Sequence, residues 1–224
     1  TLHDHIEYFE SFIQELGLEN ITLVMHGWGS VIGLDYASRY SDNIKSLAFY
    51  ESHVRPSIEW DQVSLPIQQL ASLLDDPQAA YKSIVEHNYF IDKLLPSSSV
   101  DDLSAEVLQC YRQPFSTRES RQLLWRYLHE LPLGQPDTEV VNLIQRYSHW
   151  LTQTQIPKLM LYAVPGFITT LDTVNWAKNH LPNLTLSPLD DAMHLAQESA
   201  PDLFSEKLKI WYKTRVQSAM CAQK

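Results

Sequence analysis

The stretch His26-Gly27-Trp28-Gly29-Ser30 decides how this chain folds, because it joins two segments with different hydrophobic patterns. Residues 21–25 before it read Ile-Thr-Leu-Val-Met and indicate a buried strand. Residues 31–40 after it fit a helix. A sharp strand-turn-helix element of this kind holds its central residue in a strained conformation, with the side chain pointing at a substrate. Here the central residue is Gly27, which has no side chain to present.

The segments around this turn continue an alternation of strands and helices. Apolar residues within 6–16 recur at helical spacing, and Gly17 then ends that helix. The further strands expected are 44–50, 158–163 and 184–189, and the further helices near the C-terminus are 171–180 and 201–212. From about 52 to 145 the strand signal fades and helical patterns dominate, at 67–74, 81–85, 103–111 and 121–127. The sequence therefore predicts an α/β fold with an inserted helical lid.

The motifs along the chain resemble those of the haloalkane dehalogenases, a family of α/β hydrolases, and of their relatives, the coelenterazine luciferases. At the turn, the family carries His-Asp-Trp-Gly-Ser or a close variant. The other family-like segments are Tyr8-Phe9-Glu10, Ala48-Phe49-Tyr50-Glu51, Glu59-Trp60-Asp61, Asn88-Tyr89-Phe90-Ile91, Tyr111-Arg112-Gln113-Pro114-Phe115, Ile156-Pro157-Lys158-Leu159, Pro165-Gly166, Leu181-Pro182-Asn183 and His194-Leu195-Ala196-Gln197-Glu198. The resemblance covers nearly the whole chain. It implies an α/β-hydrolase core, represented by the C-terminal part of its sheet, with an inserted helical lid. The expected division is 1–51 (partial core with the turn), 52–145 (lid), 146–215 (C-terminal core) and 216–224 (tail).

The resemblance assigns roles to four positions. Gly27 falls on the nucleophile, where the family's Asp attacks the halogen-bearing carbon, and Trp28 falls on a ligand of the leaving halide. Glu51 matches the catalytic acid of one subgroup, and His194 matches the general base. In that mechanism the carboxylate displaces the halide and forms an alkyl ester. The histidine then activates water to hydrolyse the ester, and the glutamate orients the imidazole. The resemblance implies no metal and no organic cofactor.

Two parts of this machinery are absent from the sequence. Gly27 cannot attack carbon, although glycine adopts strained torsions freely. Ser30 is not expected to replace the nucleophile, because Trp28 and Ile32, two residues to either side, are too large for a serine elbow. Its hydroxyl is expected to satisfy free backbone donors in the first helical turn. The family's His-Gly-Asn-Pro loop, which supplies half of the oxyanion and halide site, does not occur in the sequence. We therefore expect the chain to be the C-terminal portion of a longer protein or the product of a gene truncated in descent.

Composition narrows the classes of partner. The 224 residues are 44% hydrophobic, which is enough for a sizeable core. The net charge of -10, with no offsetting Lys/Arg cluster, argues against nucleic acid or an anionic membrane as a partner. Cys110 and Cys221 lack metal-binding or redox spacing, which indicates a reduced compartment, the cytoplasm. No apolar run reaches the ~20 residues of a membrane span, and no signal peptide is visible. The expected partners are a small apolar or halogenated molecule and, through an unpaired edge at strand 21–25, a second copy of the chain.

Three functions remain open at this point. The first is hydrolysis of carbon–halogen bonds in small haloalkanes, impaired or lost in this chain. The second is a non-catalytic relic, inert or binding an apolar ligand under the lid. The third is a luciferase-like oxygenase, which would also lack the Asp of its turn. The resemblance favours the first function, and the residue at position 27 favours the second.

Overall fold

The computed structural model describes residues 1–56, 59–132 and 138–218. The chain opens with α1 (Leu2–Glu15), an amphipathic helix that buries Leu2, Ile6 and Ile13 against the core. Thr1 caps α1, because its hydroxyl accepts a hydrogen bond from the backbone N–H of Asp4. Gly17, with φ of 57°, follows the end of α1, so the predicted helix and its stop are confirmed.

A parallel sheet forms the centre of the molecule. Its strands are β1 (Ile21–Gly27), β2 (Ile44–Ser52), β3 (Lys158–Tyr162) and β4 (Leu184–Pro188), in the spatial order β1-β2-β3-β4. The crossovers are α2 (Trp28–Arg39) with η1 (Ser41–Asn43) between β1 and β2, and α9 (Leu171–His180) between β3 and β4. All four expected strands are present. Because the strands are parallel, their carboxyl ends meet at one edge of the sheet, where the functional residues are expected.

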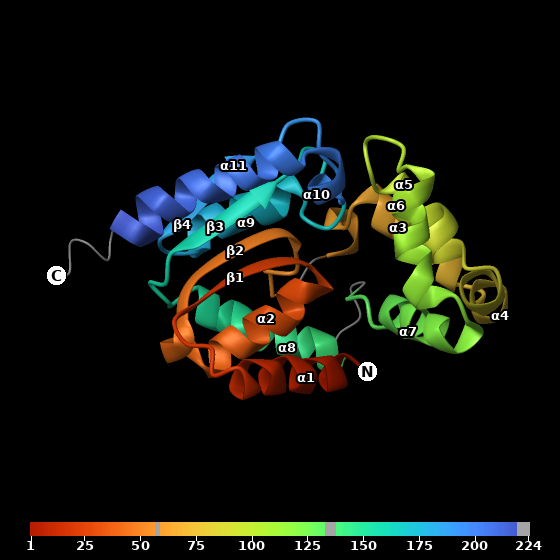
Figure 1. Cartoon of the computed structure of the whole chain (residues 1–224), viewed down its shortest axis with the longest axis horizontal. Helices are drawn as coiled ribbons and strands as arrows, with labels where there is room; N and C mark the ends of the chain where they lie inside the picture. The colour runs from red at the N-terminus through yellow and green to blue at the C-terminus, as the bar shows by residue number, and fades with distance from the viewer. Residues whose placement is uncertain (57–58, 133–137, 219–224) are drawn as a thin grey trace.

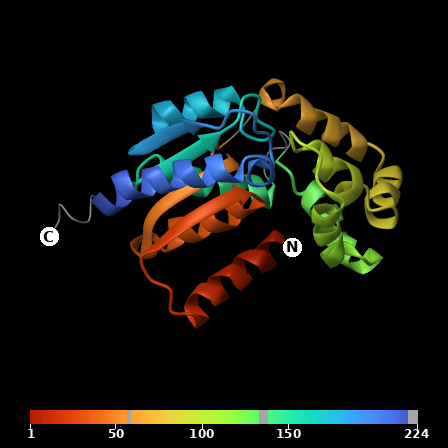
Figure 2. The same ribbon diagram turned by 45° about the horizontal axis from the view of Figure 1, so that its top comes forward.

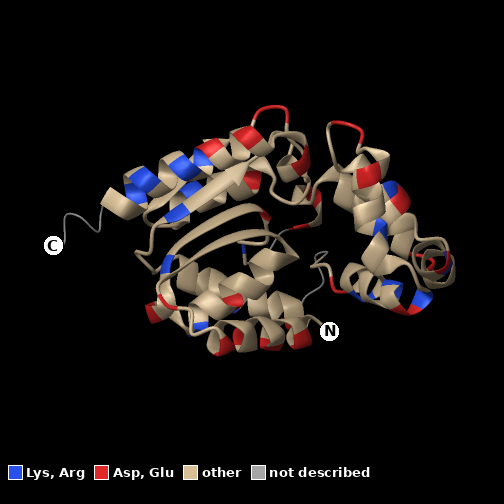
Figure 3. Cartoon of the chain, viewed as in Figure 1, with Lys and Arg blue, Asp and Glu red and all other residues tan. Residues whose placement is uncertain are grey.

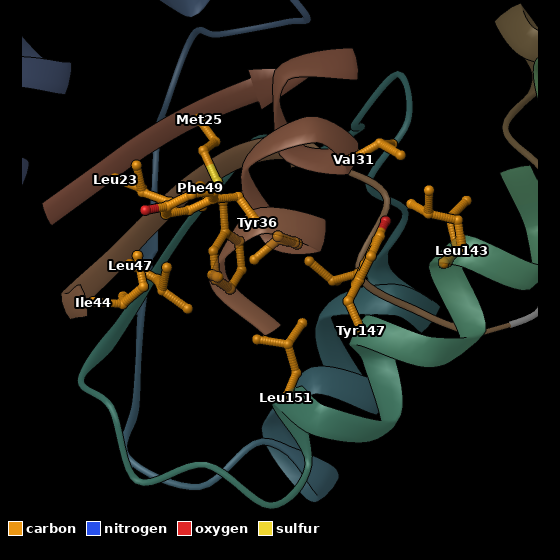
Figure 4. Packing of buried hydrophobic residues seen from close by; sticks show 14 of the residues in the cluster. Leu23, Met25, Val31, Tyr36, Ile44, Leu47, Phe49, Leu143, Tyr147 and Leu151 are labelled. Atoms are coloured by element: carbon orange, nitrogen blue, oxygen red, sulfur yellow. The ribbon is translucent and has the colours of Figure 1, made fainter. Parts of the chain in front are cut away.

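Alternate residues of the strands pack on opposite faces of the sheet. Leu47 and Phe49 of β2 belong to a core cluster shared with α1, α2, α9 and α8 (Glu139–Leu151). Ala48 and Tyr50 point to the other face, which α11 (Pro201–Trp211) and η6 (Tyr212–Gln217) cover. Figures 1 and 2 show α11 on the face opposite α2 and α8, and Figure 4 shows the larger cluster from close by. The sheet is therefore covered on both faces, as its near-continuous apolar strands require.

The chain segment that connects β2 to β3 contains a group of helices, which stands apart from the sheet (Figure 1). We call the segment from α3 to α7 the lid. Its elements are α3 (Leu65–Leu74), α4 (Pro77–Tyr81), η3 (Lys82–Glu86), η4 (Phe90–Leu94), α5 (Leu95–Ser97), α6 (Ala105–Arg112), η5 (Gln113–Phe115) and α7 (Arg118–His129), and η2 (Trp60–Gln62) precedes it. The lid has a small core of its own, which includes Ile84 and Ile91 and which Trp28 and Phe167 join from the sheet side. The expected helical insertion is confirmed.

Helix α8 connects the lid to β3 but packs against the sheet. Its buried residues, Val140, Leu143, Ile144, Tyr147, Ser148 and Leu151, include five members of the larger core cluster. The expected lid boundary after residue 145 therefore falls inside a helix that lies on the core. The division into domains remains a prediction.

Strand β1 ends the described sheet, because β2 is its only strand partner there. Val24 is 51% exposed, and a cavity of about 340 Å³ runs along β1 between Phe9 of α1 and Ile32 of α2. Unpaired strand edges favour association with another strand. Across the described ranges of the chain, no helix is both long enough and apolar enough to cross a membrane.

Candidate active site

The turn after β1 has the torsions of a strained elbow. Gly27 precedes the first residue of α2 and has φ of 52° and ψ of -128°. Residues with a Cβ rarely adopt this combination. A methyl group at Gly27 would lie 3.8 Å from Cε1 and 3.9 Å from Nε2 of His194 and, leaving the neighbouring residues aside, would meet no other described atom within 4 Å. The empty position at Gly27 therefore faces the imidazole of His194.

Glu51 lies near the carboxyl end of β2, fully buried, with a positive φ of 48°. Its carboxylate accepts three backbone N–H groups: Phe167 (3.0 Å) and Ile168 (2.6 Å) on Oε2, and Thr169 (3.2 Å) on Oε1. Hydrogen bonds to a charged group each contribute about 1.5–3 kcal/mol. This nest of N–H groups gives the buried carboxylate three hydrogen-bond donors without a cationic side chain.

Gly166 makes the approach of this nest to Glu51 possible. A Cβ at Gly166 would lie 1.9 Å from the carbonyl oxygen of Thr169 and 2.9 Å from Oε1 of Glu51. Neither atom can move away without breaking the nest. The segment after β3 therefore needs a glycine at this position.

His194 receives its orientation from Glu51. The Nδ1 atom of His194 lies 3.1 Å from Oε2 of Glu51, and the imidazole is about one fifth exposed. When Nδ1–H donates to the carboxylate, Nε2 is left to accept a proton. Because Nε2 is the ring nitrogen near the empty position at Gly27, the pair has the arrangement of a general base and its orienting acid.

Three contacts tie the backbone around His194 to three different elements. The carbonyl of His194 accepts from Nε2 of His26 at 2.8 Å, and the carbonyl of Met193 accepts from the hydroxyl of Tyr50. The N–H of Leu195 donates to the carbonyl of Ser98, next to the lid helix α5, at 3.2 Å. Burial lowers the pKa of His26 to about 4, so its ring is neutral and donates through Nε2. Strands β1 and β2 and the lid therefore position His194 together.

Trp28 forms a wall of the site next to the empty position. Its ring lies 5.0 Å from the ring of Tyr127 on α7 and 5.7 Å from that of His53. Burial lowers the pKa of His53 to about 4, and its Nε2 has no hydrogen-bond partner among the described residues. Trp28 thus lies where the lid and the core meet.

Ser30 is engaged in a structural role. Its buried hydroxyl donates to the carbonyl of Gly27 at 2.7 Å and accepts from the N–H of His53 at 3.1 Å. Ser30 lies in the first turn of α2 and accepts a backbone N–H, as expected, but this N–H belongs to the segment after β2. With both contacts made inside the core, Ser30 is unsuited to act as a nucleophile.

A cavity of about 880 Å³ lies between the lid and the carboxyl ends of the strands. Gly27, Trp28 and His194 line its core side, and Leu70 of α3 and Tyr111 of α6 line its lid side. Its described lining holds no Asp, Glu, Lys or Arg. Acidic residues occur along α1 and basic residues along α11 (Figure 3). Among the described residues, no three His, Cys, Asp or Glu side chains gather as metal ligands would. The cavity has the size and apolar character of a small-molecule site.

The fold thus brings together all four residues singled out in the sequence: Gly27, Trp28, Glu51 and His194. Sequence reasoning missed the N–H groups of 167–169 and the contacts of His26, Tyr50 and His53. Pro165-Gly166 was a usable signal for the first, since a Pro-Gly pair marks a tight turn. Nothing in the spacing of the other three indicated their partners.

Comparison with known proteins identifies the fold. The family model described as "alpha/beta hydrolase fold" matches residues 1–201. A haloalkane dehalogenase of Mycolicibacterium smegmatis is 31% identical over 208 residues, which cover 92% of this chain and 66% of that protein. A haloalkane dehalogenase of Agrobacterium fabrum is 28% identical over 211 residues, which cover 94% of this chain and 69% of that protein. The chain therefore spans about two thirds of the length of these relatives.

Solved structures give the same result. The haloalkane dehalogenase DatA from Agrobacterium tumefaciens superposes with a TM-score of 0.88 at 28% identity, covering 95% of this chain and 73% of that one. A putative ancestral haloalkane dehalogenase superposes with a TM-score of 0.87 at 30% identity, covering 94% and 74%. With sequence similarity and fold in agreement, the chain belongs to the haloalkane dehalogenase family of α/β hydrolases.

Proposed function

We propose that this chain binds a small halogenated or apolar molecule under the lid and does not cleave it. One observation supports this most directly: the position that faces Nε2 of His194 is occupied by Gly27, which has no side chain and lines the cavity under the lid. Displacing a halide from carbon needs an electron-pair donor in line with the breaking bond. Glycine supplies none.

The base and its acid do not replace the missing nucleophile. In the proposed family mechanism, His194 and Glu51 act in the second step, in which water hydrolyses an ester. Without that ester, His194 could only deprotonate water for a direct attack on the carbon–halogen bond. That route forgoes the covalent intermediate that divides one high barrier into two lower ones. We therefore expect no useful rate of halide release.

The binding role rests on the shape and chemistry of the cavity. Trp28 and Leu70 contribute to its apolar lining, and His194, Tyr111 and Gln197 add a few polar groups. A volume of about 880 Å³ accommodates a haloalkane of several carbons. Trp28 would lie beside the halogen. We also propose that β1, at the edge of the described sheet, pairs with the same strand of a second copy.

Quenching of tryptophan fluorescence by 1-bromobutane, measured together with bromide release, tests the proposal. We expect saturable quenching that Trp28→Phe removes, because bromine quenches an adjacent indole. The matched control is Trp60→Phe, which removes a tryptophan that is 47% exposed and should leave the saturable component intact. Bromide should not exceed the amount released in buffer.

Two results would contradict the proposal. Quenching that rises linearly without saturation, equally in both variants, would show that no bromoalkane binds in the cavity. Bromide release that disappears in His194→Ala would show that the chain cleaves the bond despite Gly27.

A further inference from the structure

The space at Gly27 opens into the cavity beside His194. A methyl group there would be in ordinary contact with His194, at 3.8 and 3.9 Å, and would otherwise point into open space. The space is continuous with the cavity that Trp28 and Phe167 line. The carboxylate of Glu51 is already bound by three N–H groups on the far side of the imidazole. A small molecule can therefore enter next to Nε2 of His194 without displacing a side chain.

The surroundings select the charge of that molecule. With Glu51 holding Nδ1, Nε2 of His194 faces the space at Gly27 and donates into it when it carries a proton. No carboxylate lies in the described lining of the cavity to compete for this donor. An anion that accepts one hydrogen bond through one oxygen, and keeps a second oxygen free, fits this arrangement. A monocarboxylate meets this requirement, because one of its oxygens can accept the hydrogen bond while the other stays free.

Size selects within this class. A covalent side chain would begin ~1.5 Å from Cα, whereas a free molecule must stay ~3.5–4.0 Å away. Each carbon added behind the carboxyl group therefore pushes its oxygens farther from the elbow. Formate has no such carbon, acetate has one, and pivalate carries a branched group. The expected order of fit is formate, then acetate, with pivalate excluded.

We infer that formate enters the space at Gly27 and acts as the nucleophile that the chain lacks, transferring its oxygen to a bromoalkane held in the cavity. This inference rests on the proposed binding function. An oxygen of formate forms a bond to the carbon that carries bromine, and the carbon–bromine bond breaks with its electron pair leaving on bromide. The product is an alkyl formate.

His194 can then complete the cycle. Once the ester has formed, Nε2 releases its proton to solvent. It then takes a proton from water, whose oxygen attacks the formyl carbon, and the bond from that carbon to the alkoxy oxygen breaks. The alcohol leaves with the proton from His194, and formic acid loses its own proton to solvent. The alcohol therefore retains the oxygen that formate supplied. In the protein's own reaction with water as the nucleophile, that oxygen would come from water.

The test incubates the chain with 1-bromobutane and sodium formate labelled with oxygen-18 in both positions. Because the cavity holds the two reactants together, we expect bromide release at least about tenfold above the same solution without protein, with a saturable dependence on formate. The label should appear in butyl formate and in 1-butanol. Acetate should give a smaller increase and pivalate none.

Two variants distinguish a requirement for the space at Gly27 from a general effect of altering the turn after β1. Gly27→Ala fills the space with a methyl group and should abolish the formate-dependent release. Gly29→Ala is the matched control, since a Cβ at Gly29 has no neighbour within 4 Å. The carboxylate series uses the unaltered chain, so it decides the matter even if Gly27→Ala does not fold.

The outcomes distinguish the two proposals. Saturable quenching by 1-bromobutane without formate-dependent bromide would overturn this inference and leave the binding function standing. Unlabelled alcohol, or equal rates with formate and pivalate, would also overturn it. Bromide released at the same rate without any carboxylate would instead overturn the proposed function, and absence of quenching would remove the basis of both.

Discussion

Replacing Gly27 with alanine should destabilise the chain through the backbone alone. The added methyl group clashes with nothing, because its described contacts are the ordinary ones with His194 at 3.8 and 3.9 Å. The torsions of 52° and -128° remain, and a residue with a Cβ in such a region costs about 1–3 kcal/mol. Alanine also restricts the unfolded chain, which returns about 0.4–1 kcal/mol. The net loss expected in the free energy of unfolding is therefore about 1–2 kcal/mol.

Urea and thermal unfolding, followed by circular dichroism, measure this loss. For a domain of this length, about 2–4 °C of Tm accompanies each kcal/mol, so Tm should fall by about 2–8 °C. The Tm of Gly17→Ala should fall by a similar amount, because Gly17 has φ of 57° and open space around it. Gly29→Ala, at a helical position with equally open space, should match the wild type or exceed it. A Gly27→Ala chain as stable as the wild type, with Gly17→Ala destabilised, would refute the argument that the elbow is strained.

Two further predictions concern pH and association. Burial lowers the pKa of His26 and of His53 to about 4, so the unfolded chain binds more protons between that value and the ordinary 6.5. The stability is therefore full above about pH 6.5 and decreases as the pH falls, by about 2 kcal/mol per histidine at pH 5. Urea melts of the double variant His26→Gln, His53→Gln should show a flatter pH dependence, and an unchanged slope would contradict this assignment. Light scattering after size-exclusion chromatography should find dimers or larger species that Val24→Lys, a charge on the β1 edge, converts to monomers. A wild-type chain that elutes as a monodisperse monomer would exclude pairing through this edge.

The local pattern of the sequence was sufficient to predict the four strands and several helices, although α8 (Glu139–Leu151) was not among them. The strand expected at 21–25 is the first part of β1, and the helix expected at 171–180 matches α9 (Leu171–His180). Both segments follow rules that operate within a few residues, namely apolar periodicity, caps and glycine stops. The helical insertion was visible for the same reason. The C-terminal boundary of this insertion was not visible in the sequence, because α8 has one amphipathic pattern throughout. Only its packing shows that α8 lies on the sheet.

The family motifs by themselves placed Gly27, Trp28, Glu51 and His194 in one site, since parallel strands direct their carboxyl ends to one edge. The loss of the nucleophile is likewise a property of the sequence, because glycine has no donor atom in any conformation. Only the tertiary structure decided which residues surround Gly27, the position where the nucleophile is lost. Contacts between residues more than a hundred positions apart, such as Glu51 with Ile168, depend on how the β3 loop and the last loop reach the sheet edge. No local pattern encodes such distances, so only the folded chain shows that the acid and base remain assembled around an empty position.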